Sequence, residues 1–129
     1  MRSIALVSGI ACSTLLAFNL AFADSAATRS MADITMNMKH LPGDSDKQKL
    51  AAIAANSDSS KAEVAVATAI SNFEHKVADA DKEKLKSVIA DESTPAGLRE
   101  LASILLGINH SPGEADIEKL EQIVAESGE

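Results

Sequence analysis

The sequence predicts an all-α protein built from three tandem copies of a 35-residue αα-hairpin, and three observations predict it. The chain contains three histidines, and they are spaced 35 residues apart. Apolar residues recur at helical spacing within each interval. A short apolar segment with the features of a signal peptide precedes the first copy. We therefore expect six helices that form either a short α-solenoid or a compact helical bundle.

Residues 1–23 have the pattern of a signal peptide. Arg2 supplies one positive charge, residues 4–20 are largely apolar, and Ala21-Phe22-Ala23 forms a small-x-small cleavage site before Asp24. The apolar segment is short for a membrane anchor, and no basic cluster follows it. We expect cleavage after residue 23 and export, with the bacterial periplasm as the destination.

The single cysteine, Cys12, lies within this segment and would be removed with it. The competing interpretation is that Cys12 is a lipid-attachment site. The apolar segment continues well beyond Cys12, however, so this cysteine is in the wrong position for such a site. The mature chain would then have no disulfide. Packing alone must hold its fold together.

Composition narrows the range of partners. The chain carries a net charge of −7, and Phe73 is the one aromatic residue after the signal peptide. Nucleic acids and anionic membranes are bound through clustered lysine and arginine, so neither is an expected partner once the signal has been cleaved. Platforms that stack aromatic side chains on sugars or bases are excluded because only one aromatic residue is left to build them. An acidic domain with an unknown protein partner is the expectation.

The repeat extends well beyond the histidines. Three copies of 35 residues span 24–58, 59–93 and 94–128, so the predicted cleavage site coincides with the first repeat boundary. Several other residues are identical at this interval in all three copies: Ala32/Ala67/Ala102, Asp46/Asp81/Asp116, Lys49/Lys84/Lys119, Leu50/Leu85/Leu120 and Ala55/Ala90/Ala125.

Each copy contains two segments with apolar residues at positions i, i+3, i+4 and i+7, which indicates two amphipathic helices. Helix starts are marked by Ser60 with Glu63, by Thr94-Pro95 and by Ser111-Pro112, which are capping signals. The linkers are short, so the two helices of a copy should lie antiparallel. We expect the six helices over residues 26–39, 42–56, 60–74, 77–91, 95–109 and 112–126.

The turn between the two helices of each copy, which we call the corner, carries the strongest chemical signal. It has a repeated His-x3-Asp/Glu-x-Asp motif at residues 40–46, 75–81 and 110–116. The structural interpretation places the first acid in the opening turn of the second helix, where the helix dipole favours negative charge. It also pairs each histidine with the acid six residues later, as a clasp that fixes the corner. The candidate residues are His40, Asp44 and Asp46 in the first copy, His75, Asp79 and Asp81 in the second, and His110, Glu114 and Asp116 in the third.

The alternative interpretation of the corners is a metal site. Imidazole and carboxylate groups bind zinc, copper or nickel, and histidine also ligates haem iron. Met36, one turn before His40, is a further candidate ligand for copper, whereas Met31 and Met38 align with apolar residues of the other copies and are expected in the core. Stacked repeats hold equivalent atoms about 10 Å apart. One histidine per corner is then too few for a tight site, which favours the clasp.

No pattern of catalytic residues stands out in the sequence. The mature part has no cysteine, tyrosine, HExxH motif or glycine-rich phosphate loop. We therefore expect a non-catalytic, exported protein-interaction or accessory module without a cofactor. The alternative is a metal- or haem-binding accessory protein that uses the corner histidines. The distance between these histidines distinguishes the two hypotheses.

Overall fold

The computed structural model describes residues 25–127, so the predicted signal peptide lies outside the described residues. The described part is all-α, as the sequence predicts, and its only β-type pairings are isolated bridges between residues that flank each corner histidine. It contains six α-helices: α2 (Ala26–Asn37), α3 (Asp44–Ala55), α4 (Lys61–Ser71), α5 (Asp79–Ala90), α6 (Ala96–Gly107) and α7 (Glu114–Ser127).

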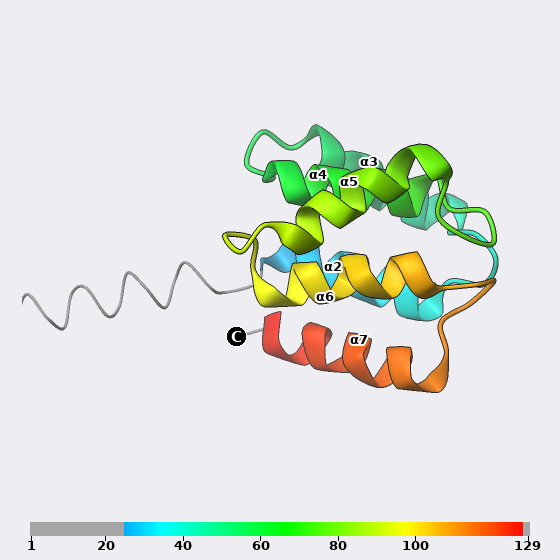
Figure 1. The fold of residues 1–129 in the computed structure, drawn as a ribbon. Coiled ribbons are helices and arrows are strands. Elements are labelled where there is room, and N and C mark those ends of the chain that lie inside the picture. The colour runs from blue at the N-terminus through cyan, green and yellow to red at the C-terminus, as the bar shows by residue number, and fades with distance from the viewer. Residues whose placement is uncertain (1–24, 128–129) are drawn as a thin grey trace, which may run out of the picture.

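The six helices form a closed ring with approximate threefold symmetry. The first helices of the three copies, α2, α4 and α6, contact one another at the centre. Each second helix packs against the first helix of the next copy, α3 on α4 and α5 on α6. The ring closes because α7 packs extensively on α2, although these are the last and the first of the described helices. Figure 1 shows the six helices, with α7 at the bottom of the view. The structure thus adopts the compact bundle, the second of the two predicted arrangements.

The core follows the threefold arrangement. Ala32, Ala67 and Ala102 are completely buried, and the small side chain at this position lets the three central helices approach closely. Larger apolar residues at equivalent positions surround them. These residues are all nearly or completely buried: Met31/Val66/Leu101, Met38/Phe73/Ile108 and Leu50/Leu85/Leu120.

Enlarging the central alanine should destabilise the protein. Ala67→Leu places three extra carbon atoms between helices that already touch, and overpacking of this kind costs about 1–3 kcal/mol in the free energy of unfolding. Urea unfolding followed by circular dichroism would measure the loss. Ala51→Leu, an equal change on the exposed face of α3, is the matched control and should alter stability by less than about 0.5 kcal/mol. Equal stabilities for the two variants would contradict the close approach of the central helices.

The central helices begin where the sequence predicts. Ser60 and Glu63 form the expected capping box at the start of α4: Ser60 Oγ accepts a hydrogen bond from the Glu63 N–H, and the Glu63 carboxylate accepts one from the Ser60 N–H. Ser25 caps α2 in the same way by accepting from the Thr28 N–H. Ser25 Oγ also donates to the Glu63 carboxylate, which ties the first copy to the second.

The outer helices begin two residues later than expected, at Asp44, Asp79 and Glu114. The reason lies in the preceding residue of the motif, which is Pro42, Val77 or Pro112. Each of these three side chains is buried, and the chain leaves the corner in an extended conformation before the helix starts. The sequence suggested proline at the first helical position, whereas the structure uses this residue to anchor the corner to the core.

Candidate functional site

The three corner histidines lie beyond the ends of the central helices. The helices α2, α4 and α6 end at Asn37, Ser71 and Gly107, slightly before the expected positions. Met38 and Ile108, which follow α2 and α6, are already extended, and the histidines beyond the helix ends have positive φ at all three corners: 66° at His40, 66° at His75 and 77° at His110. Positive φ is incompatible with a continuing right-handed helix, and it is uncommon for any residue other than glycine.

The corners are joined through the backbones of the three histidines. The His40 N–H donates to the His110 carbonyl at 2.7 Å, the His75 N–H to the His40 carbonyl at 2.6 Å, and the His110 N–H to the His75 carbonyl at 2.6 Å. Each histidine therefore donates once and accepts once, and the three bonds form a closed cycle around the threefold axis. The cycle satisfies backbone groups that a chain turn would otherwise leave unpaired.

The cycle also brings the three imidazole rings together. Ring centroids are 5.1 Å apart for His40 and His75, 5.4 Å for His40 and His110, and 4.9 Å for His75 and His110, with edge-to-face orientations. One nitrogen from each ring lies within 4.8 Å of the other two. All three side chains are exposed. The expectation that equivalent atoms of neighbouring copies stay about 10 Å apart is wrong here, because closure of the ring replaces open stacking.

The predicted histidine–acid clasp is wrong. Within the described residues 25–127, none of the three histidine side chains bonds to the acid six residues later. The acids have other partners: Asp46 lies 3.9 Å from the Lys49 ammonium, Asp81 accepts from the Asn72 amide at 3.1 Å, and Asp116 accepts from the Gly113 N–H at 3.4 Å. The physical reason is the positive φ of the histidines, which places these residues on the axis while the acids start the outer helices.

The acids of the motif serve the outer helices. Asp44, Asp79 and Glu114 are the first residues of α3, α5 and α7, as the structural interpretation expects of the first acid in each motif. The second acid of each motif lies in the same first turn. None of these acids belongs to the only group of potential metal ligands in the described part of the chain, which consists of the three histidines alone.

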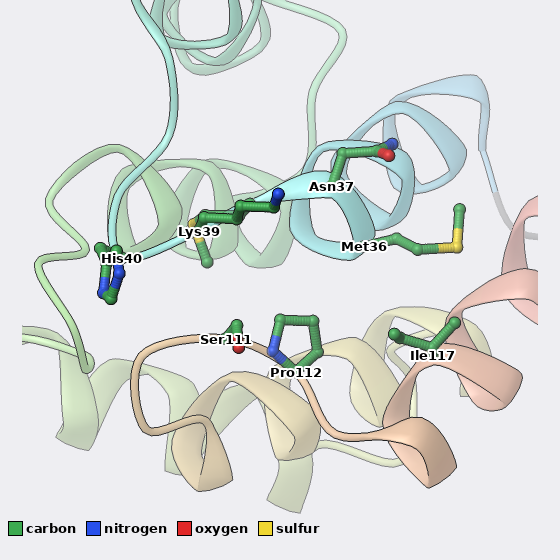
Figure 2. Close-up of a pocket in the computed structure, with 8 residues that line it drawn as sticks. Met36, Asn37, Lys39, His40, Ser111, Pro112 and Ile117 are labelled. Atoms are coloured by element: carbon green, nitrogen blue, oxygen red, sulfur yellow. The ribbon is translucent and has the colours of Figure 1, made fainter.

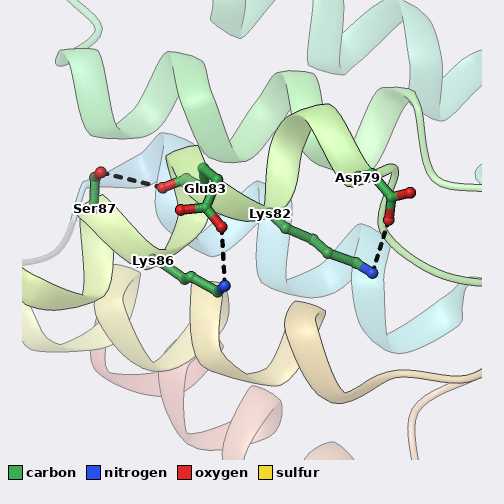
Figure 3. A network of polar contacts seen from close by, with 5 residues as sticks. All are labelled: Asp79, Lys82, Glu83, Lys86 and Ser87. Carbon is green, nitrogen blue, oxygen red and sulfur yellow. Dashed lines mark hydrogen bonds and ion pairs between the residues drawn. The ribbon is translucent and has the colours of Figure 1, made fainter.

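Asp79 illustrates how these acids are stabilised. Its carboxylate pairs with the Lys82 ammonium at 2.9 Å, and Lys86 pairs with Glu83 one turn later along α5 (Figure 3). The hydrogen bond and charge of Lys82 lower the pKa of Asp79 below its ordinary value. A lowered pKa in the folded state stabilises the protein above the unfolded pKa, and this stability is lost as the pH falls through the folded pKa. Both groups are exposed, so the effect on stability is small.

Met36 does not join the histidine cluster. Its side chain extends from α2 toward Ile117 of α7, whereas His40 lies at the other end of the same hollow (Figure 2). Met36 is half-buried there. The proposed role of Met36 as a copper ligand beside His40 therefore has no support from its position.

Sequence reasoning missed the convergence of the three histidines, although a signal for it exists. An open solenoid needs terminal copies with a polar outer face. Here the first and last copies carry the same apolar positions as the central one, as Leu50, Leu85 and Leu120 show. The apolar faces of three such copies are all buried within one chain only if the last copy packs on the first. A closed threefold ring of this kind places equivalent corner residues around one axis.

Comparison with known proteins gives no further identification. No protein-family model matches the chain, and neither a curated protein nor a solved structure matches it. Within residues 25–127, none of the helices has the length and apolar character required to cross a bilayer.

Proposed function

We propose that this protein binds a divalent transition-metal ion through His40, His75 and His110. The observation that carries the proposal is that three imidazole nitrogens lie within 4.8 Å of one another, at the end of the bundle where the three central helices end. Three neutral imidazoles are a known ligand set for zinc and also suit copper(II) and nickel(II). Among these metals we propose zinc as the first to test, because it has no redox chemistry that would complicate the measurement.

A metal site requires the three nitrogens to move somewhat closer together. A zinc ion about 2.1 Å from each nitrogen in tetrahedral geometry needs nitrogens about 3.4 Å apart. The present separations are larger by about 1.4 Å at most. The exposed imidazoles can rotate about their side-chain bonds to close this gap, while the backbone cycle keeps their Cα atoms in place.

Charges of both signs lie near the histidines. The three central helices end and the three outer helices begin at this end of the bundle, so the partial negative charges of the first set and the partial positive charges of the second offset each other. Of the acids in the corner motifs, Asp79 pairs with Lys82 and Asp46 lies near Lys49. The proposal therefore rests on the three imidazoles themselves.

The positive φ values give a second line of support. Glycine would occupy these corners with less backbone strain, yet all three copies have histidine, one of the non-glycine residues that adopt positive φ more readily than most. Strain retained at three equivalent positions is typical of residues kept for their side-chain chemistry.

Calorimetric titration of the purified protein with zinc at pH 7.5 tests the proposal. We expect one zinc ion per chain and loss of at least tenfold in affinity for His75→Asn. Asparagine tolerates positive φ, so this variant should keep the backbone cycle and remove only the imidazole. Asp81→Asn, which changes an acid of the same corner outside the cluster, is the control and should retain zinc binding. No binding by the wild type, or equal affinity for wild type and His75→Asn, would reject the proposal.

The alternative function, a protein-interaction module, rests on the edge or groove of an open solenoid. The helices whose edges such a solenoid leaves free, α2 and α7, pack on each other in the closed ring. We retain from the sequence the proposal that the protein is exported. A solvent-exposed histidine site suits an accessory role in handling metal ions outside the cytoplasm.

A further inference from the structure

A hollow of about 370 Å³ opens directly beside His40, between the end of α2 and the start of α7 (Figure 2). Its volume falls in the range typical of sites for small molecules. The lining has two parts: apolar side chains from Met36, Met38, Pro112 and Ile117, and polar ones from Asn37, Lys39 and Ser111 in addition to His40.

The apolar part of this hollow breaks the threefold symmetry. Met36 and Ile117 come from α2 and α7, the pair of helices that closes the ring. At the equivalent place between α4 and α3 the chain has Ser71 and Lys47. Between α6 and α5 it has Leu106 and Lys82. Only the corner next to His40 therefore combines two apolar residues at these positions, so the difference distinguishes one side of the symmetric histidine cluster from the other two.

The coordination chemistry explains what such a side pocket can hold. Three histidines that approach an ion from one side leave at least one coordination position open. The histidines are exposed, so that position is accessible to a ligand from solvent. Lys39 adds an ammonium group to the wall of the hollow, and a bound metal ion adds further positive charge. An anionic head group on the metal, followed by a short apolar chain along Met36 and Ile117, matches this distribution of charge and apolar surface.

We infer that the metal site takes a small chelating anion as an additional ligand, and that the hollow beside His40 holds its apolar chain. The inference rests on the proposed function, because the head group binds through the metal. It goes further by assigning the ligand class, an organic acid or hydroxamate with a short alkyl chain, and by assigning Met36 and Ile117 to recognition of that chain.

Two probes of different length test the inference on the zinc-loaded protein. Calorimetry with acetohydroxamate and hexanohydroxamate compares the same chelating head with and without an extended alkyl chain. Burial of the chain should make hexanohydroxamate bind about tenfold or more tightly than acetohydroxamate. Ile117→Lys introduces the residue type found at the two equivalent positions, and it should reduce this preference to within about twofold while leaving zinc affinity unchanged. Lys47→Ile, the reverse change at an equivalent place in α3, is the matched control and should keep the wild-type preference.

The outcomes separate this inference from the proposed function. Failure of the wild type to bind zinc in the first titration would overturn both. Zinc binding with equal affinities for the two hydroxamates would overturn the inference alone, as would equal removal of zinc by both probes. A chain-length preference that persists in Ile117→Lys would also overturn it, because the alkyl chain would then lie outside the hollow.

Discussion

Zinc in hundredfold excess over its dissociation constant should raise the melting temperature of this protein by about 10 °C or more. A ligand that binds only the folded state at this excess adds about 2.7 kcal/mol to the free energy of unfolding. For a domain of about 100 residues, each 1 kcal/mol shifts the melting temperature by about 4–8 °C. The unfolded chain has no preformed site, since the three histidines are 35 residues apart in sequence and meet only when the ring closes.

The effect should be specific to metal ions that imidazole binds well. Magnesium prefers oxygen ligands and should leave the melting temperature nearly unchanged, whereas zinc should raise it. Thermal melts with each metal at the same concentration would measure the difference. His75→Asn should melt near the metal-free wild type and respond little to zinc. A zinc-induced rise that survives this substitution would show that the metal binds elsewhere.

Leu85→Ala should be among the most destabilising single substitutions, with a loss of about 2–5 kcal/mol in the free energy of unfolding. Leu85 is completely buried, and its helix, α5, packs between α4 and α6. Truncation leaves a cavity where two copies meet, and the surrounding helices are already held by the ring and cannot collapse into it.

Lys86→Ala is the matched control for this substitution. Lys86 is exposed, and its ion pair with Glu83 lies on the surface, where such pairs contribute little. Urea unfolding of both variants gives the comparison. Similar midpoints for Leu85→Ala and Lys86→Ala would contradict the burial of Leu85 in the structure.

The sequence predicted the helices well because their signals are local. The apolar spacing around Leu50, Leu85 and Leu120 and the capping box of Ser60 and Glu63 act within one or two turns, and the structure confirms both. The helix starts that differ from the prediction also have a local cause. Pro42 and Pro112 are buried, and the helices that follow them begin two residues later than predicted.

The candidate site was only half predictable, because its geometry depends on closure of the ring. The motif singled out His40, His75 and His110 as candidate residues, and the structure brings these three side chains together. Whether they meet is decided by the contact between α2 and α7, which no local pattern encodes. The clasp failed for the same reason: a histidine whose N–H and carbonyl both bind other copies turns toward the axis and away from its own acid.

Closure of the ring also has a consequence for how the chain folds. The apolar face of α2 is covered mainly by α7, the last of the six described helices to be synthesised. A chain that is synthesised from its N-terminus must keep this face uncovered until α7 is present. The pairing of such distant segments raises the contact order well above that of an open repeat array, in which each copy needs only its neighbour. We therefore expect folding to be slower and more nearly all-or-none than in linear helical repeats of similar size.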